Sequence, residues 1–172
     1  LFDAILAYIP QPDVSIDKPF QMLVHTLDYS EYEGKIGIGK IVNGTIQSNT
    51  GVVWFRRNGG RSNERVRDIY SFVGLGRERV QSAAAGDIVA ITGIENIEIG
   101  DTLASMEDPK PLPIIEIDEP TLTMIFSVND SPFAGLDGKY VTSRNLRERL
   151  YRELRSNVSL KVHDTNSTES FH

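Results

Sequence analysis

The sequence contains no cysteine, and it has no long apolar segment. Without cysteine the chain can form neither a disulfide framework nor a cysteine-based metal site. No apolar run reaches the roughly 18 residues that a membrane-spanning helix needs, so no membrane partner is expected. A basic-then-apolar leader is also missing, and the first residue is Leu1 rather than methionine. We therefore expect a cytoplasmic protein whose N-terminus is cut from a longer chain.

Patterns typical of catalytic and metal sites are missing as well. The three histidines are scattered, with no H-E-x-x-H motif that would indicate a metal site. No G-x-S-x-G motif supports a serine nucleophile. The acid pairs at 107–108 and 118–119 lie beside prolines, as linker charges do, whereas acid–base catalysis needs a pocket and a perturbed pKa. The sequence therefore predicts no catalytic residue, no cofactor-binding residue and no metal ligand in this chain.

The first two thirds of the sequence contain short apolar runs separated by turn residues. A β-branched run at residues 88–91 ends at Gly93, and residues 102–103 follow the turn Gly100-Asp101; both runs are typical of short buried strands. Further strands are expected at residues 20–27, 35–42, 45–46, 52–57 and 65–72. This regular spacing, with little helix signal, predicts an all-β barrel that ends near residue 103.

Glycine and asparagine mark the turns of this barrel. Asn43-Gly44 is the strongest hairpin signal available and predicts that residues 45–46 start the returning strand. Residues 58–60, Asn-Gly-Gly, predict a further turn. Gly37 and Gly39 alternate through a predicted strand, which usually marks a bend or a close backbone approach. A small closed barrel needs such corners.

The segments on either side of the barrel have a different pattern. Residues 1–9 show apolar side chains at helical spacing, and Pro10 and Pro12 end this pattern. We expect the last turns of a helix from an upstream domain, followed by a linker at residues 13–18. On the other side of the barrel, three prolines between residues 109 and 113 are typical of a stiff linker.

The remaining residues predict a small α+β unit. We expect a strand at residues 121–128, a helix at about 144–155 and a strand at 158–162. Thr142 or Ser143 is the expected helix cap. The expected buried stripe of this helix consists of Leu146, Leu150 and Leu154. Three arginine–glutamate pairs spaced four residues apart are expected on its outer face: Arg144–Glu148, Glu148–Arg152 and Arg149–Glu153. Because strand–helix–strand leaves one face uncovered, we expect about half of a ferredoxin-like unit.

Arginine is unevenly distributed in a chain whose formal net charge is -6. Seven arginines fall between Arg56 and Arg79, and five between Arg144 and Arg155. Ordinary solvated faces explain such clusters on charge alone. The helix arginines have glutamate partners nearby. In the cluster between residues 56 and 79, the first four arginines instead flank the glycine-rich turn at residues 58–60, a placement that suits contact with a phosphate backbone.

The segment at residues 84–93, Ala-Ala-Gly-Asp-Ile-Val-Ala-Ile-Thr-Gly, followed by Ile-Gly-Asp-Thr-Leu at 99–103, resembles the second domain of the translation-factor GTPases. This is the superfamily of EF-Tu and EF-G. Gly-Lys-Ile-Gly-Ile-Gly at 34–39, Val-Asn-Asp-Ser-Pro-Phe at 128–133 and Gly-Lys-Tyr-Val-Thr-Ser-Arg at 138–144 are similar to its TypA/BipA branch. The LepA-type and EF-G branches share the barrel segment but not these. The resemblance covers nearly the whole chain.

The resemblance implies a mostly β fold, in which a translation-factor-type β-barrel precedes a partial ferredoxin-like α+β domain. Residues 1–17 would be a helix remnant and linker from a missing G domain, 18–108 the barrel, 109–113 the proline-rich linker and 114–172 an incomplete unit like EF-G domain III. No G-x-x-x-x-G-K-[ST], D-x-x-G or N-K-x-D motif occurs in this chain. GTP and Mg²⁺ are therefore expected in the missing G domain of the parent.

The implied function is that of a non-catalytic ribosome-docking fragment. The parent would hydrolyse GTP and act in translation, ribosome assembly or the stress response. Implied partners are small-subunit ribosomal RNA, ribosomal proteins and the parent's own G domain and C-terminal domains. The candidate RNA-binding residues are Arg56, Arg57, Arg61 and Arg65, with Lys139, Arg144 and Arg147 as secondary candidates.

Three alternatives stay open at this point. A self-contained enzyme could bind a small ligand at the barrel mouth, although no convergent polar set stands out in the sequence. A stand-alone interaction or oligomerisation module could pair through the unfinished sheet edge at residues 158–162. A LepA-like or EF-G-like branch is the third.

Overall fold

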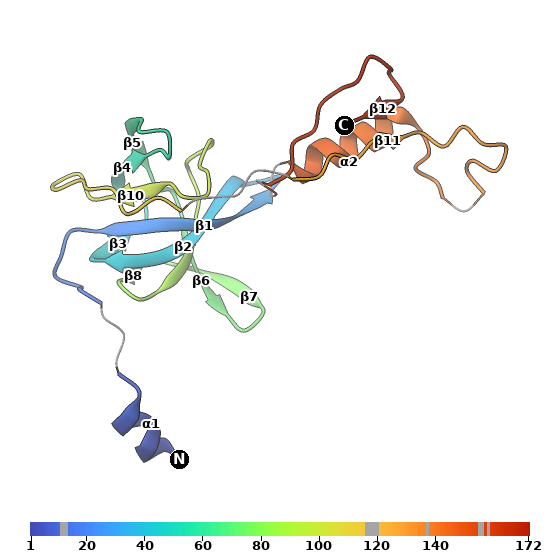
Figure 1. Cartoon of the computed structure of the whole chain (residues 1–172). Coiled ribbons are helices and arrows are strands. Elements are labelled where there is room, and N and C mark those ends of the chain that lie inside the picture. Colours follow the sequence, from blue (N-terminus) through green and yellow to red (C-terminus); the bar gives the residue numbers. More distant parts are fainter. Residues whose placement is uncertain (11–13, 116–120, 137, 155–156, 158) are drawn as a thin grey trace.

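A computed structural model of the chain describes residues 1–10, 14–115, 121–136, 138–154, 157 and 159–172 (Figure 1). Within these residues the chain forms two helices and twelve strands. In chain order they are α1 (Phe2–Tyr8), β1 (Gln21–Ser30), β2 (Gly34–Asn43), β3 (Thr45–Gln47), β4 (Gly51–Phe55), β5 (Arg61–Arg65), β6 (Ile69–Val73), β7 (Gly76–Val80), β8 (Ser82–Ala84), β9 (Ile88–Ile91), β10 (Thr102–Ala104), β11 (Phe126–Ser127), α2 (Ser143–Glu153) and β12 (Ser170–Phe171). The predicted mostly β fold class is confirmed.

The strands β1 to β10 build the barrel. Eight of them form one sheet in the order β5-β4-β10-β1-β2-β9-β6-β7, and β3 pairs separately with β8. The continuous segment from β5 to β6 joins the two ends of this order, because β5 pairs with β4 and β6 pairs with β9. Between these strands Val66 N donates to Thr50 O at 3.0 Å and Arg67 N donates to Thr92 O at 2.8 Å. The sheet therefore curls back on itself, as Figure 1 shows.

Aliphatic side chains fill the interior of the barrel. Met22, Ile41, Ile69 and Leu103 are each 0% exposed, and they come from four different strands. Along β1 the burial alternates through Met22 and Val24, as a strand with one face on a core requires. Removing this apolar surface from water is the main favourable contribution to folding.

Two glycines of β2, Gly37 and Gly39, lie in close contact with neighbouring segments, as the sequence predicts. A Cβ atom on Gly39 would lie 1.9 Å from the backbone oxygen of Leu23, and one on Gly37 would lie 2.8 Å from Cδ1 of Ile97. The pairing of β1 with β2 shifts register between Val24 and Thr26, next to Gly39. Such a bulge bends the strand and adds twist, which helps the sheet to curve.

The hairpin predicted at Asn43-Gly44 is wrong. The strand that follows, β3, pairs with β8 rather than returning along β2. Gly44 has a φ of +70°, and a Cβ on it would lie 2.5 Å from Lys18 O. Its N–H also donates to Ser15 O at 2.8 Å. Glycine is needed here because the segment before the barrel packs against the turn, so the turn does not close a two-residue loop.

One further strand prediction within the barrel needs correction, and some strands were not predicted. The strand predicted at residues 65–72 is wrong for residues 66–68, because β5 ends at Arg65 and β6 begins only at Ile69. The bend between them carries the chain from one end of the sheet to the other. The strands β7 and β8 have no predicted counterpart, since Gly-Arg-Glu-Arg-Val and Ser-Ala-Ala carry too few apolar residues to show alternation.

The segments flanking the barrel contain the predicted helix and the proline-rich residues expected to be a linker. The helix α1 is confirmed, and none of its residues is buried. Pro12 lies outside the described residues. Residues 109–113 form neither helix nor strand, and two hydrogen bonds hold them to the barrel. Leu112 N donates to Thr102 Oγ1 at 3.1 Å, and Gln21 Nε2 donates to Lys110 O at 2.8 Å.

The C-terminal unit, residues 121–172, contains the predicted helix. Thr142 is confirmed as the cap of α2, because its Oγ1 accepts a hydrogen bond from Asn145 N at 3.3 Å. Two of the three predicted pairs form, namely Glu148–Arg152 at 3.3 Å and Arg149–Glu153. The third pair, Arg144–Glu148, is absent from the ion pairs among the described residues. Arg155 lies outside these residues.

Burial and strand pairing in this unit differ from the prediction. The expected buried stripe is only half-buried, at Leu146, Leu150 and Leu154. Of the strand predicted at 121–128, only β11 forms, and it pairs with β12. The strand predicted at 158–162 is wrong for residues 159–162, while Val158 lies outside the described residues. Its alternation is suited to a strand, but β11 takes Ser170–Phe171 as its partner instead.

Neither α1 nor α2, the helices of the described chain, has the length and apolar character needed to cross a membrane.

Candidate nucleic-acid interface

The predicted turn at residues 58–60 closes a regular hairpin of β4 and β5, which we call the arginine hairpin (residues 51–65). The two strands pair from Gly51 opposite Arg65 to Phe55 opposite Arg61. At the tip Arg56 N donates to Gly60 O at 2.7 Å. Gly59 adopts a φ of +86°, a conformation that glycine reaches without strain. The turn is therefore confirmed, and it presents the flanking arginines at one end of the barrel.

The four candidate arginines are all exposed, but they lie on two faces of the hairpin. Along β5, exposed Arg61 and Arg65 alternate with half-buried Ser62. Successive strand residues point to opposite faces. The guanidinium of Arg56 donates to Ser62 Oγ at 3.3 Å, so it lies on the face opposite to the first two. The structure thus brings the four residues to one hairpin without gathering them into one cluster.

The four side chains also differ in how firmly they are held. The Cζ atom of Arg56 lies 4.2 Å from the centre of the Trp54 ring, a cation–π contact. Arg65 donates from Nη1 to Oδ1 of Asn49 at 3.1 Å. The guanidinium groups of Arg57 and Arg61 make no hydrogen bond or ion pair with any described residue. These two groups are therefore available to an anionic partner.

One buried carboxylate, that of Asp101, holds the base of the hairpin. The residue is 1% exposed. Its Oδ2 accepts hydrogen bonds from Trp54 Nε1 and from Glu98 N, both at 2.8 Å. Its Oδ1 accepts one from Arg57 N at 3.0 Å. A buried charge needs such donors, and here they come from residues 54–57 of the hairpin and from Glu98 in the loop just before Asp101.

Sequence reasoning treated Asp101 only as part of a turn. A carboxylate between two apolar residues, Ile99 and Leu103, was the available signal. Such a position predicts a buried acceptor that requires partners. The identity of those partners could not be read from the chain, because Trp54 stands 47 positions away in sequence.

A hollow of about 380 Å³ lies beside the hairpin, and we call it the Trp54 hollow. Its lining residues are Trp54, Arg56, Arg57, Asn58, Asn96, Glu98 and Asp101. It combines an aromatic wall, two guanidinium groups, two side-chain amides and carboxylate oxygens. This mixture can contact charged, polar and planar groups at once.

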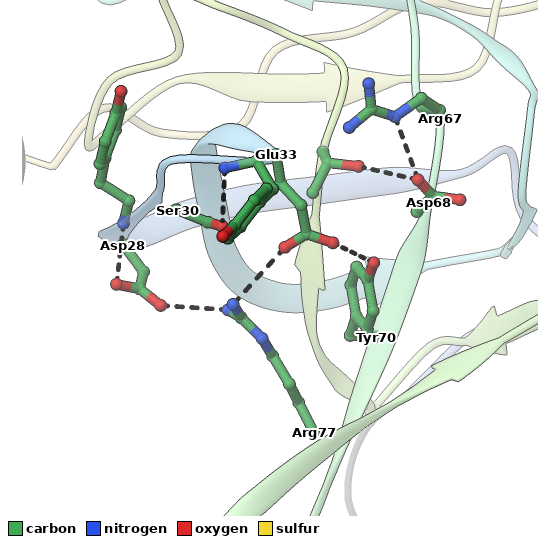
Figure 2. A network of polar contacts seen from close by, with 10 residues as sticks. Asp28, Ser30, Glu33, Arg67, Asp68, Tyr70 and Arg77 are labelled. Carbon is green, nitrogen blue, oxygen red and sulfur yellow. Dashed lines mark hydrogen bonds and ion pairs between the residues drawn. The ribbon is translucent and has the colours of Figure 1, made fainter.

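The other three arginines of the cluster pair with carboxylates, and Figure 2 shows two of them, Arg67 and Arg77. Arg77 contacts Asp28 at 3.0 Å and Glu33 at 3.5 Å. Arg67 contacts Asp68 at 3.0 Å, and Arg79 pairs with the same carboxylate. These pairs neutralise the three guanidinium groups within the barrel. The seven arginines therefore divide into the four candidates on the hairpin and three in a structural network.

Tyr70 belongs to the same network. Its hydroxyl donates to Oε1 of Glu33, and the two residues point toward one another in Figure 2. This hydrogen bond, helped by burial, raises the pKa of the Tyr70 phenol above its ordinary value of 10.0. The network therefore joins β1, the turn between β1 and β2, β6 and β7 by ion pairs and one hydrogen bond.

The secondary candidates lie in the C-terminal unit. Lys139 and Arg144 are exposed. Arg147 donates to Asp164 at 2.9 Å, and its guanidinium lies 5.3 Å from the Tyr151 ring centre. Arg147 is therefore engaged within its own unit. Within the described part of the chain, no group of three or more acidic or histidine side chains could hold a metal ion.

Comparison with known proteins supplies the family relationship. The family described as elongation factor G domain 2 matches residues 19–106. A large ribosomal subunit assembly factor BipA from Synechocystis is 48% identical over 99% of this chain, which corresponds to 29% of that protein. The proteins of the same name from Bacillus subtilis and Escherichia coli K12 are 42% and 43% identical, each over 99% of this chain and 28% of their own length. The chain thus spans less than a third of these relatives.

Proposed function

The chain belongs to the elongation factor G domain 2 family, and from this premise we propose that it is the ribosome-docking part of a larger BipA-like GTP-binding protein. Its homology to BipA proteins agrees with the resemblance found in the sequence and favours this branch over a LepA-like or EF-G-like one. In this proposal the hairpin arginines contact ribosomal RNA. The module itself performs no chemistry.

The observation that carries the proposal is the local charge of the arginine hairpin. The chain as a whole has a formal charge of -6. Residues 56–65 nevertheless contain four arginines and a single acidic residue, Glu64, and all four arginines are exposed. Guanidinium groups bind phosphate oxygens with paired hydrogen bonds. Phosphate contacts of this kind position a protein on RNA without reading its sequence.

The proposed partner is the ribosome, and the subunit is a point that experiment must decide. The resemblance implied small-subunit ribosomal RNA, with ribosomal proteins beside it. The relatives are named assembly factors of the large ribosomal subunit. Both subunits expose phosphate backbone, so the hairpin chemistry suits either. In this proposal the protein binds ribosomes in the cytoplasm.

The proposal also divides the chain and assigns the chemistry to other parts of the parent. Residues 18–108 are the docking barrel, 109–113 the linker and 114–172 part of a second domain that contacts the rest of the parent. The region before residue 18 leads to a G domain. GTP and Mg²⁺ bind in that G domain, where the parent hydrolyses GTP.

The test compares two variants of this chain that lose the same charge. One carries Arg56→Ala, Arg57→Ala, Arg61→Ala and Arg65→Ala. The control carries Arg149→Ala, Arg152→Ala, Lys40→Ala and Lys110→Ala, four exposed cations that are not candidate RNA contacts. Affinity for purified small and large ribosomal subunits is measured over a range of salt concentrations, after circular dichroism has verified that both variants are folded.

We expect the hairpin variant to bind at least tenfold more weakly at low salt. Its salt dependence should flatten by roughly 0.7–0.9 in log–log slope for each phosphate that the variant no longer neutralises. The control should bind like the unmodified chain. Equal losses in the two variants, or none in either, would contradict the proposal. The subunit that shows the difference identifies the docking partner.

The alternative of an oligomerisation module has lost its supporting observation. Pairing through a sheet edge at residues 158–162 required a strand there, and residues 159–162 form none.

The alternative of a self-contained enzyme requires convergent polar groups, and the Trp54 hollow does supply them. Its polar groups, however, lie beside the exposed arginines, which favours an RNA contact.

A further inference from the structure

We infer that the Trp54 hollow takes a single unstacked nucleotide from an RNA strand that lies along the arginine hairpin. The inference rests on the proposed RNA-docking function and adds the form of RNA that is bound. It concerns the lining of the hollow, whereas the docking proposal concerns the exposed charge of the whole hairpin.

The size of the hollow favours one nucleotide over a base pair. Its volume is about 380 Å³, near the lower end of the roughly 300–1,000 Å³ found for small-molecule sites. The bases of an A-form duplex are stacked, and their edges lie in grooves that side chains read poorly. An unpaired nucleotide can enter such a hollow with its base face exposed.

Arg56 provides a stacking platform at the wall of the hollow. One face of its guanidinium is covered by the Trp54 ring at 4.2 Å, and the hydrogen bond to Ser62 at 3.3 Å fixes its orientation. The residue is nevertheless exposed. Its outer face therefore offers a flat cationic surface, and unstacked RNA bases stack on such guanidinium planes.

The remaining lining residues match the other parts of a nucleotide. Arg57 has an exposed guanidinium that bonds to no described residue, which suits a phosphate. The amide of Asn96 both donates and accepts, and it also makes no hydrogen bond within the described chain. The carboxylate of Glu98 can accept from a ribose 2′-hydroxyl or a base amino group. A bare anion would be repelled by Glu98, so a ligand with donors as well as a charge fits better.

The hollow is held in shape before any ligand arrives. Asp101 accepts hydrogen bonds from the indole of Trp54 and from the backbone of Arg57 and Glu98. Three parts of the wall are therefore tied to one buried carboxylate. Binding sites whose walls are fixed in this way lose less entropy when they bind.

The experiment uses Trp54, the single tryptophan of the chain, as a reporter inside the site. The full chain is titrated with a ten-nucleotide single-stranded RNA, with the same strand annealed to its complement, and with inorganic phosphate. We expect a saturable change in Trp54 emission with the single strand. The duplex should bind at least tenfold more weakly, and phosphate at equal concentration should leave the emission unchanged.

Two single substitutions form a matched pair for this test. Arg57→Ala and Arg61→Ala each remove one exposed guanidinium that has no bond to a described residue, but only Arg57 lines the hollow. Arg57→Ala should lower the affinity for the single strand at least fivefold and remove most of its preference over the duplex. Arg61→Ala should weaken single strand and duplex by the same factor. Asn96→Ala, which keeps the charge, should also reduce the preference for the single strand.

Several outcomes would overturn the inference. If the single strand binds without altering Trp54 emission, the hollow is not occupied. If Arg57→Ala and Arg61→Ala have the same effect, the hairpin acts through charge alone. In both cases the ribosome-docking proposal would stand, because its test depends on charge and on whole subunits. If inorganic phosphate reproduces the emission change, the hollow is an anion site and the nucleotide inference fails.

Discussion

The barrel and the C-terminal unit contain similar apolar patterns, yet they bury these side chains to very different extents. In the barrel, Met22, Ile41 and Leu103 are each 0% exposed. Among the described residues from 121 onward, Phe171 alone is buried. The helix α2 has a capped N-terminus and leucines at helical spacing, but none of its residues is buried.

This difference teaches that a pattern determines a local element, whereas burial depends on a partner for its apolar face. The barrel strands surround one another, so each inner face is covered. In the C-terminal unit Leu122, Met124 and Leu136 are 84%, 64% and 74% exposed. We therefore expect substitutions in the barrel to reduce stability much more than matched substitutions in the C-terminal unit.

The largest expected effect comes from removing a core leucine. Leu103→Ala should lower the free energy of unfolding by about 3 kcal/mol, through reduced burial and the cavity left behind. The matched substitution in the C-terminal unit, Leu146→Ala on the half-buried face of α2, should lower the free energy of unfolding by less than about 1 kcal/mol. Leu146 buries less apolar surface on folding than Leu103 does. Urea unfolding followed by Trp54 fluorescence measures both. Equal losses would show that α2 stabilises the barrel and would end the comparison.

A matched pair of glycine substitutions should give nearly as large a difference in unfolding free energy between the barrel and the C-terminal unit. Gly39→Ala places a Cβ 1.9 Å from Leu23 O, so the strands must move apart, at a cost of about 2–3 kcal/mol. Gly138→Ala meets nothing within 4 Å and should be neutral, or stabilising by about 0.5 kcal/mol. Thermal unfolding by circular dichroism is the measurement. A harmless Gly39→Ala would mean that β1 and β2 are not closely apposed there.

The hydrogen bond from Tyr70 to Glu33 should give a smaller and pH-dependent effect. Tyr70→Phe should cost about 1 kcal/mol at pH 7, because a part-buried hydrogen bond to a charged acceptor is removed. The folded-state pKa of Tyr70 is raised above 10.0, so this stabilisation is fully present below pH 10 and is lost as the pH rises through the folded-state pKa.

Denaturation at pH 7, 9 and 11 tests this expectation. The difference between Tyr70→Phe and the unmodified chain should be constant up to about pH 9 and then shrink. Tyr140→Phe in the C-terminal unit is the control, because Tyr140 is 85% exposed and should show no difference at any of these values. A stability difference between Tyr70→Phe and the unmodified chain that grows between pH 9 and pH 11 would refute the assigned hydrogen bond.

The smallest expected effect concerns the surface of α2. Arg149→Ala removes the exposed pair with Glu153, and such pairs four residues apart contribute about 0.3 kcal/mol. We expect slightly lower helicity by circular dichroism at low salt, with no difference at 1 M salt, where exposed charges are screened. A loss that persists in high salt would point to packing by the arginine stem.

Much of the fold follows from local patterns in the sequence. Apolar β-branched runs predicted the positions of β1, β2, β4, β9 and β10, and glycine spacing predicted the close approach along β2. The turn at residues 58–60 and the cap at Thr142 also followed from residue type. These features depend on φ preference, side-chain alternation and short-range hydrogen bonds. The candidate arginines were found in the same way, from their spacing about a turn.

Tertiary structure decided which elements are partners. The pairing of β3 with β8, the bend that splits β5 from β6 and the missing strand at residues 159–162 each depend on a distant segment. The same holds for the site, where the pairing of β10 with β4 brings Asp101 to Trp54, and where carboxylates of the described residues pair with Arg77 but not with Arg57. The sequence by itself determined where strands, turns and charges occur. Their pairing required the folded chain, because buried polar groups must find donors and acceptors wherever packing brings them.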